Sequence, residues 1–143
     1  MSIADEQQIE QANQALAGQG PTAVIKWAYE RFATDRIALA CSLGAEDVAL
    51  LDILAKAQTG AKAFVLDTGR LHEETYETLM LCRSRYNNLK IEAYFPQHAA
   101  VEELVNTKGP FSLNDSVEDR KACCAIRKVA PLGRALAGQD VWL

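Results

Sequence analysis

The 143-residue chain lacks the features that several protein classes require. It contains only four prolines, eight glycines and two histidines, and no apolar run approaches the roughly 20 residues of a membrane span. Its N-terminus is polar and acidic, unlike a signal peptide. The formal net charge of −4 does not indicate a general nucleic-acid surface. We therefore expect an ordered, cytoplasmic protein that binds small anions or proteins, and neither nucleic acid nor membrane.

The chain is also poor in cysteine, but two of its four cysteines are adjacent. In a reducing compartment we expect thiols or metal ligands instead of structural disulfides. Cys123 and Cys124 lie in the basic stretch Arg-Lys-Ala-Cys-Cys-Ala-Ile-Arg-Lys at 120–128. Thiolates bind zinc, copper(I) and iron–sulfur clusters, and basic neighbours favour the negative charge of such centres. The pair therefore indicates a metal or redox site, with two packed or reactive thiols as the alternative.

The spacing of the cysteine pair favours a large metal centre. Adjacent helical residues point about 100° apart, so Cys123 and Cys124 cannot easily hold one small ion from the same side. A cluster of several irons suits them better, because each thiolate can bind its own iron, whereas zinc prefers a wider spacing. Cys41 and Cys82 have no such companion, and we interpret them as packed thiols.

Apolar periodicity predicts helices that alternate with short strands. Predicted strands are Arg36–Cys41, Ala61–Leu66, Leu89–Phe95 near a sheet edge, and the beginning of another at Val141–Leu143. The predicted helices are Asp5–Leu16, Pro21–Phe32, one ending at Lys56, Glu73–Tyr86, Ala99–Val105 and one that carries the cysteine pair. This alternation predicts an α/β fold, a parallel sheet with helices on both faces. We expect a single domain, 1–143, with 1–20 as an N-terminal helix.

Three local expectations accompany this assignment. Tyr76, Leu79 and Met80 are predicted to form the inward stripe of their helix. Asp115 or Ser116 is predicted to cap the cysteine-bearing helix. Pro131 is predicted to interrupt that helix, with a short helix restarting through Ala137.

Two loops that follow the first two strands are candidate binding sites, since ligands of such sheets bind beyond the carboxyl ends of the strands. The first loop consists of Ser42, Leu43, Gly44, Ala45, Glu46 and Asp47. Its small residues allow close approach of a ligand, and the helix N-terminus that follows attracts phosphate or sulfate. It matches neither the Walker pattern nor G-x-G-x-x-G. Alternatively, Ser42 is an ordinary helix cap with first-turn carboxylates behind it.

The second loop consists of Asp67, Thr68, Gly69 and Arg70. It offers backbone N–H groups and a guanidinium that can bind an oxyanion with two hydrogen bonds. Asp67 can orient the neighbouring loop by hydrogen bonding. A common turn with a solvated Arg70 is an equal alternative. The Asp-Thr-Gly signature of aspartic proteases does not apply, because the chain is not all-β.

Three motifs in order resemble one family. They are Ser-Leu-Gly-Ala-Glu-Asp-Val-Ala-Leu-Leu (42–51), Leu-Asp-Thr-Gly-Arg-Leu-His-Glu-Glu-Thr-Tyr (66–76) and Cys-Cys-Ala-Ile-Arg-Lys-Val-Ala-Pro-Leu (123–132). Together they closely resemble the adenylyl-sulfate (APS) and phosphoadenylyl-sulfate (PAPS) reductases of sulfate assimilation, from about Thr22 onward. The third motif looks like that of the iron–sulfur branch, which mostly reduces APS. The resemblance implies an adenine-nucleotide-binding fold related to ATP pyrophosphatases.

The resemblance also implies roles for particular residues. Cys123 and Cys124 match two ligands of a [4Fe–4S] cluster, and Lys128 matches the lysine near cluster and substrate. The Ser42–Asp47 loop would hold the phosphosulfate, and Leu66 with the following turn would contact the adenosine. The family's reaction is attack of a cysteine thiolate on the sulfate sulfur with release of AMP. A thioredoxin, glutaredoxin or glutathione-type thiol then frees sulfite.

The chain departs from the family pattern at its C-terminal side. The family's second cysteine pair, its substrate-binding arginines and its nucleophilic cysteine have no match in these 143 residues. We therefore expect a C-terminally truncated, inactive fragment with at most a labile cluster. Two alternative functions remain open. The first is an ATP-pyrophosphatase-type enzyme, which would need Ser-Gly-Gly-x-Asp-Ser in the first loop, and the second is a non-catalytic nucleotide-binding module. Formation of a homo-oligomer also remains open.

Overall fold

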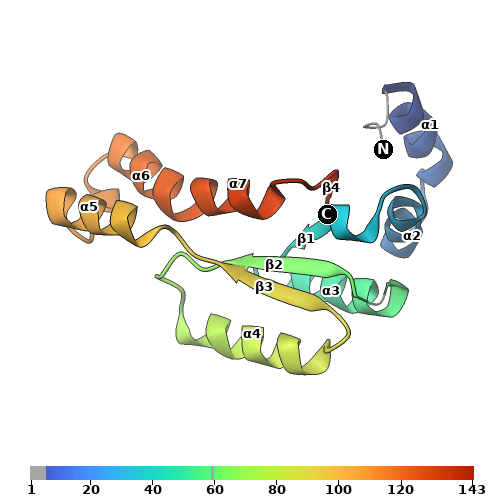
Figure 1. Cartoon of the computed structure of the whole chain (residues 1–143), viewed down its shortest axis with the longest axis horizontal. Helices are drawn as coiled ribbons and strands as arrows, with labels where there is room; N and C mark the ends of the chain where they lie inside the picture. The colour runs from blue at the N-terminus through green and yellow to red at the C-terminus, as the bar shows by residue number, and fades with distance from the viewer. Residues whose placement is uncertain (1–5, 59) are drawn as a thin grey trace.

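The computed structural model, which describes residues 6–58 and 60–143, is an α/β fold with a parallel sheet (Figure 1). The described strands run in the order β3-β2-β1-β4, and all three neighbouring pairs are parallel. They are β1 (Ile37–Ala40), β2 (Lys62–Leu66), β3 (Lys90–Tyr94) and β4 (Val141–Trp142). The predicted fold class is confirmed, and β3 lies at a sheet edge as expected.

Helices cover both faces of the sheet. In Figure 1, α3 (Ala45–Ala57) and α4 (Glu73–Arg85) lie below the strands, whereas α7 (Ala130–Leu136) lies above them. The remaining helices are α1 (Glu6–Leu16), α2 (Pro21–Arg31), α5 (His98–Lys108) and α6 (Val117–Cys124), with short 3-10 turns at Thr34–Arg36 and Ser112–Asn114. Asp5 of the predicted first helix lies outside the described residues. No described helix is both long and apolar enough to cross a membrane.

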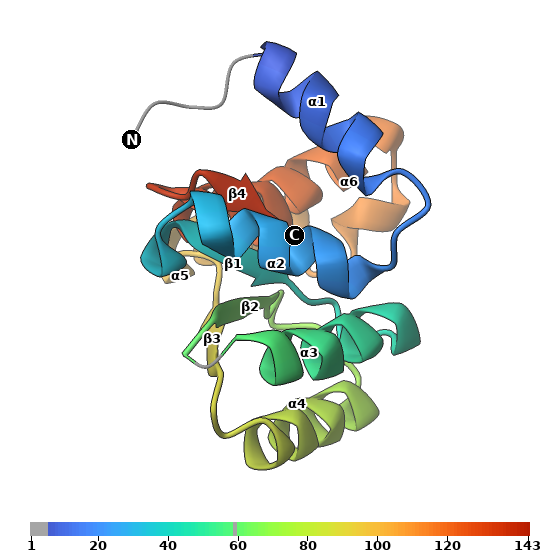
Figure 2. The same ribbon diagram turned by 90° about the vertical axis from the view of Figure 1, so that its right-hand side faces the viewer.

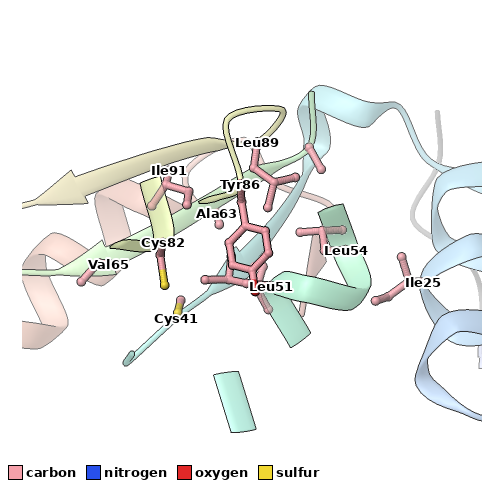
Figure 3. Packing of buried hydrophobic residues seen from close by; sticks show 12 residues of the cluster. Ile25, Cys41, Leu51, Leu54, Ala63, Val65, Cys82, Tyr86, Leu89 and Ile91 are labelled. Carbon is pink, nitrogen blue, oxygen red and sulfur yellow. The ribbon is translucent and has the colours of Figure 1, made fainter. Parts of the chain in front are cut away.

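The larger core lies between the sheet and the helices α2, α3 and α4 (Figure 3). Leu51 and Leu54 of α3 are fully buried there, and each such leucine stabilises the fold by about 1.5–3 kcal/mol. Cys41 and Cys82 are buried in the same cluster, and burial raises the pKa of both thiols, that of Cys41 to about 11. Neither cysteine is therefore a thiolate at neutral pH, in agreement with their interpretation as packed thiols.

A smaller core on the opposite face holds α7 against the sheet. Its buried members are Ala38, Phe64 and Ala135. The small side chains of Ala38 and Ala135 allow the helix close to the strands, while Leu66 and Leu132 pack around them half-buried. This arrangement places the segment that precedes α7, which carries the cysteine pair, over the carboxyl ends of β1 and β2 (Figure 1).

Strand β4 is joined to β1 by an ion pair as well as by the strand ladder. Arg36 Nη2 donates to Asp140 Oδ1 at 2.6 Å, and Arg36 Nε donates to the other carboxylate oxygen at 2.5 Å. This hydrogen-bonded pairing lowers the pKa of Asp140 and raises that of Arg36. Beyond it, the Leu143 N–H donates to the Ala38 carbonyl. The expected strand at 141–143 is thus present beside β1.

The predicted inward stripe of α4 is wrong in part. Met80 is 72% exposed and Tyr76 is 38% exposed, whereas Cys82 is buried and Leu79 packs against the core. Because each residue turns the helix by about 100°, the buried positions continue from Leu79 to Cys82 and Tyr86, and Met80 points away. Tyr76, Leu79 and Met80 do share a helical spacing, but the buried direction of α4 passes through Leu79 on the side away from Met80.

The predicted interruption at Pro131 is also wrong. The helix continues from α6 into α7 through a π-helical segment, Ala125–Val129, in which the Ala130 N–H donates to the Ala125 carbonyl. The ring of a proline clashes with the carbonyl four residues before it in a regular α-helix. A wider turn just before Pro131 accommodates that residue without ending the helix. At the start of α6, Ser116 is the cap as predicted, and its Oγ accepts from the Asp119 N–H at 3.0 Å.

Candidate functional site

A cavity of about 420 Å³ opens where the order of the strands reverses. From β1 the chain continues to β2 and β3 on one side, while β4 lies on the other side. Ligands of open α/β sheets bind at this switch point. The cavity is lined by strand ends, loop residues and the helix above them, among them Ala40, Ser42, Asp47, Leu66, Thr68, Lys128, Leu132 and Trp142.

The first loop has a backbone conformation that is unusual for its sequence. Leu43 has a φ of +66°, a left-handed conformation that costs a leucine about 1–2 kcal/mol. The Ser42 N–H donates to Asp47 Oδ2 at 2.6 Å, and the Gly44 N–H donates to Ser42 Oγ at 3.3 Å. These two hydrogen bonds hold residues 42–47 in a closed turn, and the chain enters α3 directly from it.

The N-terminus of α3 is not capped by a side chain. Gly44 occupies the N-cap position, so the alternative in which Ser42 caps the helix is wrong. The first N–H groups of a helix have no partner within the helix. Ala45 and Glu46, the first two helical residues, are exposed, and their N–H groups can therefore receive an anion at the positive end of the helix dipole.

The second loop is organised by Asp67, which is 4% exposed. Its Oδ1 accepts hydrogen bonds from the Gly69 N–H at 2.8 Å and from the Tyr76 hydroxyl at 3.0 Å. Gly69 has a φ of +71°, which glycine adopts without a steric cost. Asp67 thus fixes its own turn and ties it to α4, so the expectation that Asp67 orients the neighbouring loop is wrong.

Arg70 does not reach the first cavity. Its Nη1 donates to the Pro110 carbonyl at 2.7 Å, and its guanidinium lies 5.1 Å from the centre of the Phe111 ring. These contacts direct the side chain toward a second cavity. The two candidate loops therefore do not converge on one ligand through Arg70, although Thr68 of the second loop lines the first cavity.

The second cavity, of about 520 Å³, contains the cysteine pair. Cys123 is buried and Cys124 is exposed, and both line the cavity. Its basic lining residues are Arg70, Arg120, Arg127 and Lys128. Two thiol side chains in one cavity among cations suit an anionic thiolate–metal cluster. Residues 6–58 and 60–143 contain no group of three or more potential metal ligands.

Three residues, Thr68, Leu71 and Lys128, line both cavities. The cysteine pair and the Ser42–Asp47 loop therefore lie on the same side of the molecule, separated by one wall. Lys128 is exposed in that wall. Its ammonium group can interact with an anion in the first cavity and with a thiolate centre in the second.

Arg127 has a structural role that the sequence did not predict. Its Nη1 donates to the Thr68 carbonyl at 2.7 Å, and its Nε is buried without a hydrogen-bond partner in the described part of the chain. The bond ties the π-helical segment to the second loop. In the sequence, Arg127 is one of four basic residues around the pair, and no local signal distinguishes it from the others. Trp142, Leu132 and Leu71 were missed as cavity residues because distant segments bring them together.

Replacing Arg127 by methionine is expected to lower the free energy of unfolding by about 1–2 kcal/mol, because a charge-assisted hydrogen bond to Thr68 is lost. Urea unfolding at neutral pH measures this loss. Arg120→Met is the matched control, since Arg120 is an exposed cation of the same cavity. An equal loss of stability in both variants would contradict a specific contribution of the Thr68 contact.

Comparison with known proteins agrees with this geometry. The family model of the phosphoadenosine phosphosulfate reductase domain matches residues 36–143. Proteins named adenosine 5'-phosphosulfate reductase from Neisseria meningitidis serogroup B and Allochromatium vinosum are 43% identical over 104 and 109 residues. These alignments cover 73% and 76% of this chain and 42% of each relative. The chloroplastic 5'-adenylylsulfate reductase 3 of Arabidopsis thaliana is 37% identical over 143 residues, which are 30% of its length.

A solved structure shows the same fold. The phosphoadenylyl-sulfate reductase of Candida auris, in a phosphate complex, matches with a TM-score of 0.79 at 22% identity. The match covers 99% of this chain and 68% of that chain. The chain thus spans less than half the length of the bacterial relatives named above. Since the family model covers residues 36–143, the chain belongs to the phosphoadenosine phosphosulfate reductase domain family.

Proposed function

We propose that this chain is the nucleotide-binding part of an assimilatory reductase that converts adenylyl sulfate to sulfite and AMP. The observation that carries the proposal is the wall of Thr68, Leu71 and Lys128 between the anion loop and the cysteine cavity. A sulfonucleotide in the first cavity and a thiolate centre in the second would be neighbours, with Lys128 between them. The curated relatives' names support adenylyl sulfate as the substrate.

The substrate would lie in the first cavity. Its phosphosulfate would accept hydrogen bonds from the N–H groups at the start of α3, with Ser42 and Gly44 shaping the loop. The adenosine would contact Leu66 and the turn from Asp67 to Gly69. Lys128 would balance the negative charge from the opposite wall.

A [4Fe–4S] cluster is the proposed cofactor of the second cavity. Cys123 and Cys124 would bind two of its irons, and the described residues thus supply two of the four thiolates such a cluster takes. When bound, the cluster supplies an electrostatic field beside the anionic substrate. Arg120, Arg127 and Lys128 of this chain would offset its negative charge.

The reaction needs a nucleophilic thiolate. In the proposed first step the thiolate sulfur forms a bond to the sulfate sulfur, the bond from that sulfur to the bridging oxygen breaks, and AMP leaves. Two thiols of a thioredoxin or glutaredoxin then become a disulfide as sulfite is released. Cys41 and Cys82 are buried with raised pKa values, so neither is suited to this attack. We propose the cytoplasm as the location, since the four cysteines are free thiols.

Isothermal titration calorimetry of residues 1–143 with APS, PAPS and ATP tests the proposal. We expect APS to bind more tightly than ATP, because the anion loop lacks the second glycine and final serine of ATP pyrophosphatases. We also expect no sulfite release with thioredoxin, since no cysteine outside the pair is accessible. Tighter binding of ATP would instead favour an ATP-pyrophosphatase-type enzyme. Absence of binding would contradict the proposal, whereas sulfite release by this polypeptide would contradict only its expected inactivity.

A further inference from the structure

Two layers of the molecule hold the turn at residues 67–69, which follows β2. From α4, the Tyr76 hydroxyl donates to Asp67 Oδ1 at 3.0 Å. From the π-helical segment between α6 and α7, Arg127 Nη1 donates to the Thr68 carbonyl at 2.7 Å. In Figures 1 and 2, α4 lies on one side of the strands and α6 lies on the other. The turn is therefore held from both faces of the sheet.

Tyr76 contributes to this turn through its hydroxyl and not through core packing. It is 38% exposed, and neither of the two described core clusters includes it. Desolvation, followed by the hydrogen bond to Asp67, raises the pKa of Tyr76, so the hydroxyl keeps its proton and remains a donor at neutral pH. The buried Asp67 needs such donors, since a buried carboxylate without hydrogen bonds is costly.

Arg127 lies directly against the turn. Gly69 has a φ of +71°, and a Cβ at that position would lie 3.4 Å from Arg127 Nη1. The guanidinium thus covers the glycine at van der Waals distance while it binds the neighbouring carbonyl. Thr68, which supplies that carbonyl, lines both cavities. Arg127 itself lines the second cavity and not the first, and Tyr76 lines neither.

We propose that Arg127 and Tyr76 are positioning residues for nucleotide binding, because they hold residues 67–69 in the conformation that receives the adenosine. This inference rests on the proposed function, which places an adenine nucleotide in the first cavity. Since neither side chain lines that cavity, both act through the turn. The Ser42–Asp47 loop has hydrogen bonds of its own, so the anion site is independent of the two residues.

The two donors differ in how much of the turn depends on them. The affinity of a ligand falls in proportion to the fraction of the protein that has the binding-competent conformation. Without Arg127, the Thr68 carbonyl loses a charge-assisted bond, and we expect the affinity for AMP to fall about tenfold. Without the Tyr76 hydroxyl, Asp67 still accepts from the Gly69 N–H at 2.8 Å, so we expect a smaller loss of about threefold.

Calorimetric titration of residues 1–143 with AMP and with inorganic pyrophosphate tests the inference, at a temperature where every variant is folded. Arg127→Met and Tyr76→Phe are expected to bind AMP about tenfold and about threefold more weakly. Pyrophosphate lacks the adenosine, so its affinity is expected to change by less than about twofold. Arg127→Lys keeps a donor for the carbonyl and is expected to retain more affinity for AMP than Arg127→Met.

Two control variants remove bonds of the same kind elsewhere. Arg83→Met deletes a guanidinium that donates to the Ile91 carbonyl at 3.0 Å, and Tyr94→Phe deletes a hydroxyl that donates to Glu92 at 3.1 Å. Neither residue lines either cavity, so both variants are expected to bind AMP like the unmodified chain. A purely structural role of the two positioning residues would leave the AMP affinity of the folded chain unchanged.

The outcomes separate this inference from the proposed function. If the unmodified chain does not bind AMP, both are overturned. If it binds AMP and neither Arg127→Met nor Tyr76→Phe weakens that binding, only the positioning role is overturned. Equal weakening of AMP and pyrophosphate, or equal weakening by the control variants, would also overturn that role, because the effect would then not come through the turn.

Discussion

Replacing both Cys123 and Cys124 by serine is expected to remove the iron and sulfide that the chain binds after anaerobic reconstitution. The unmodified chain is expected to bind a cluster that is lost quickly, because two thiolates leave half of the irons without cysteine ligation. A serine hydroxyl is a hard, weak ligand for such irons. Visible absorbance and iron analysis during dialysis measure both the binding and the loss.

The buried cysteines provide the control for this experiment. Cys82→Ala removes a thiol from the core without affecting the cavity, so it is expected to lower stability but to keep the bound iron. Loss of iron in Cys82→Ala at a temperature where the variant is folded would contradict the assignment. A stable four-iron cluster in the unmodified monomer would contradict the expected lability.

Replacing Lys128 by alanine is expected to weaken the binding of adenylyl sulfate by about tenfold to a hundredfold. Lys128 lines both cavities, and a charge-assisted hydrogen bond from its ammonium group to an anion would contribute about 1.5–3 kcal/mol. The loss should be much smaller for adenosine, which lacks the phosphosulfate. Calorimetric titration of the variant with both ligands separates these contributions.

Lys121→Ala is the control for Lys128. Lys121 belongs to the same basic stretch and is exposed, but it lines neither cavity. Its replacement changes the net charge equally and should affect affinity by less than about twofold, since surface charges at a distance are screened by salt. Equal effects of the two variants would show that Lys128 acts only through general electrostatic attraction.

The parts of the fold that sequence predicts well are those where local pattern and packing agree. The buried strand at Ile37–Ala40 has apolar residues on both faces, and a parallel sheet with helices on both sides requires that pattern. The positions of the two loops followed from the strand ends alone. Ser116 begins its helix through local chemistry that a short stretch of sequence contains.

The parts that sequence did not predict depend on contacts between distant segments. Arg70 binds the Pro110 carbonyl forty residues away, and Arg127 binds the Thr68 carbonyl fifty-nine residues away. No local pattern distinguishes either arginine from a solvated cation. Met80 was assigned to an inward stripe with Tyr76 and Leu79, whereas its angular position relative to the buried Cys82 decides its exposure. The roles of the site residues in binding and catalysis stay predictions.

The wide helical turn between Cys124 and Ala130 has a further consequence for any engineering of this segment. It accommodates one more residue than an α-helical turn, so deleting a single residue such as Ala125 would let the helix revert to regular winding. The helix would keep its length and its axis. Because the deletion removes only the extra residue of that turn, the two sulfurs would keep nearly the same direction relative to Pro131 and the rest of α7. Such a deletion variant would therefore keep both its helical circular dichroism and the direction in which its cysteine pair faces.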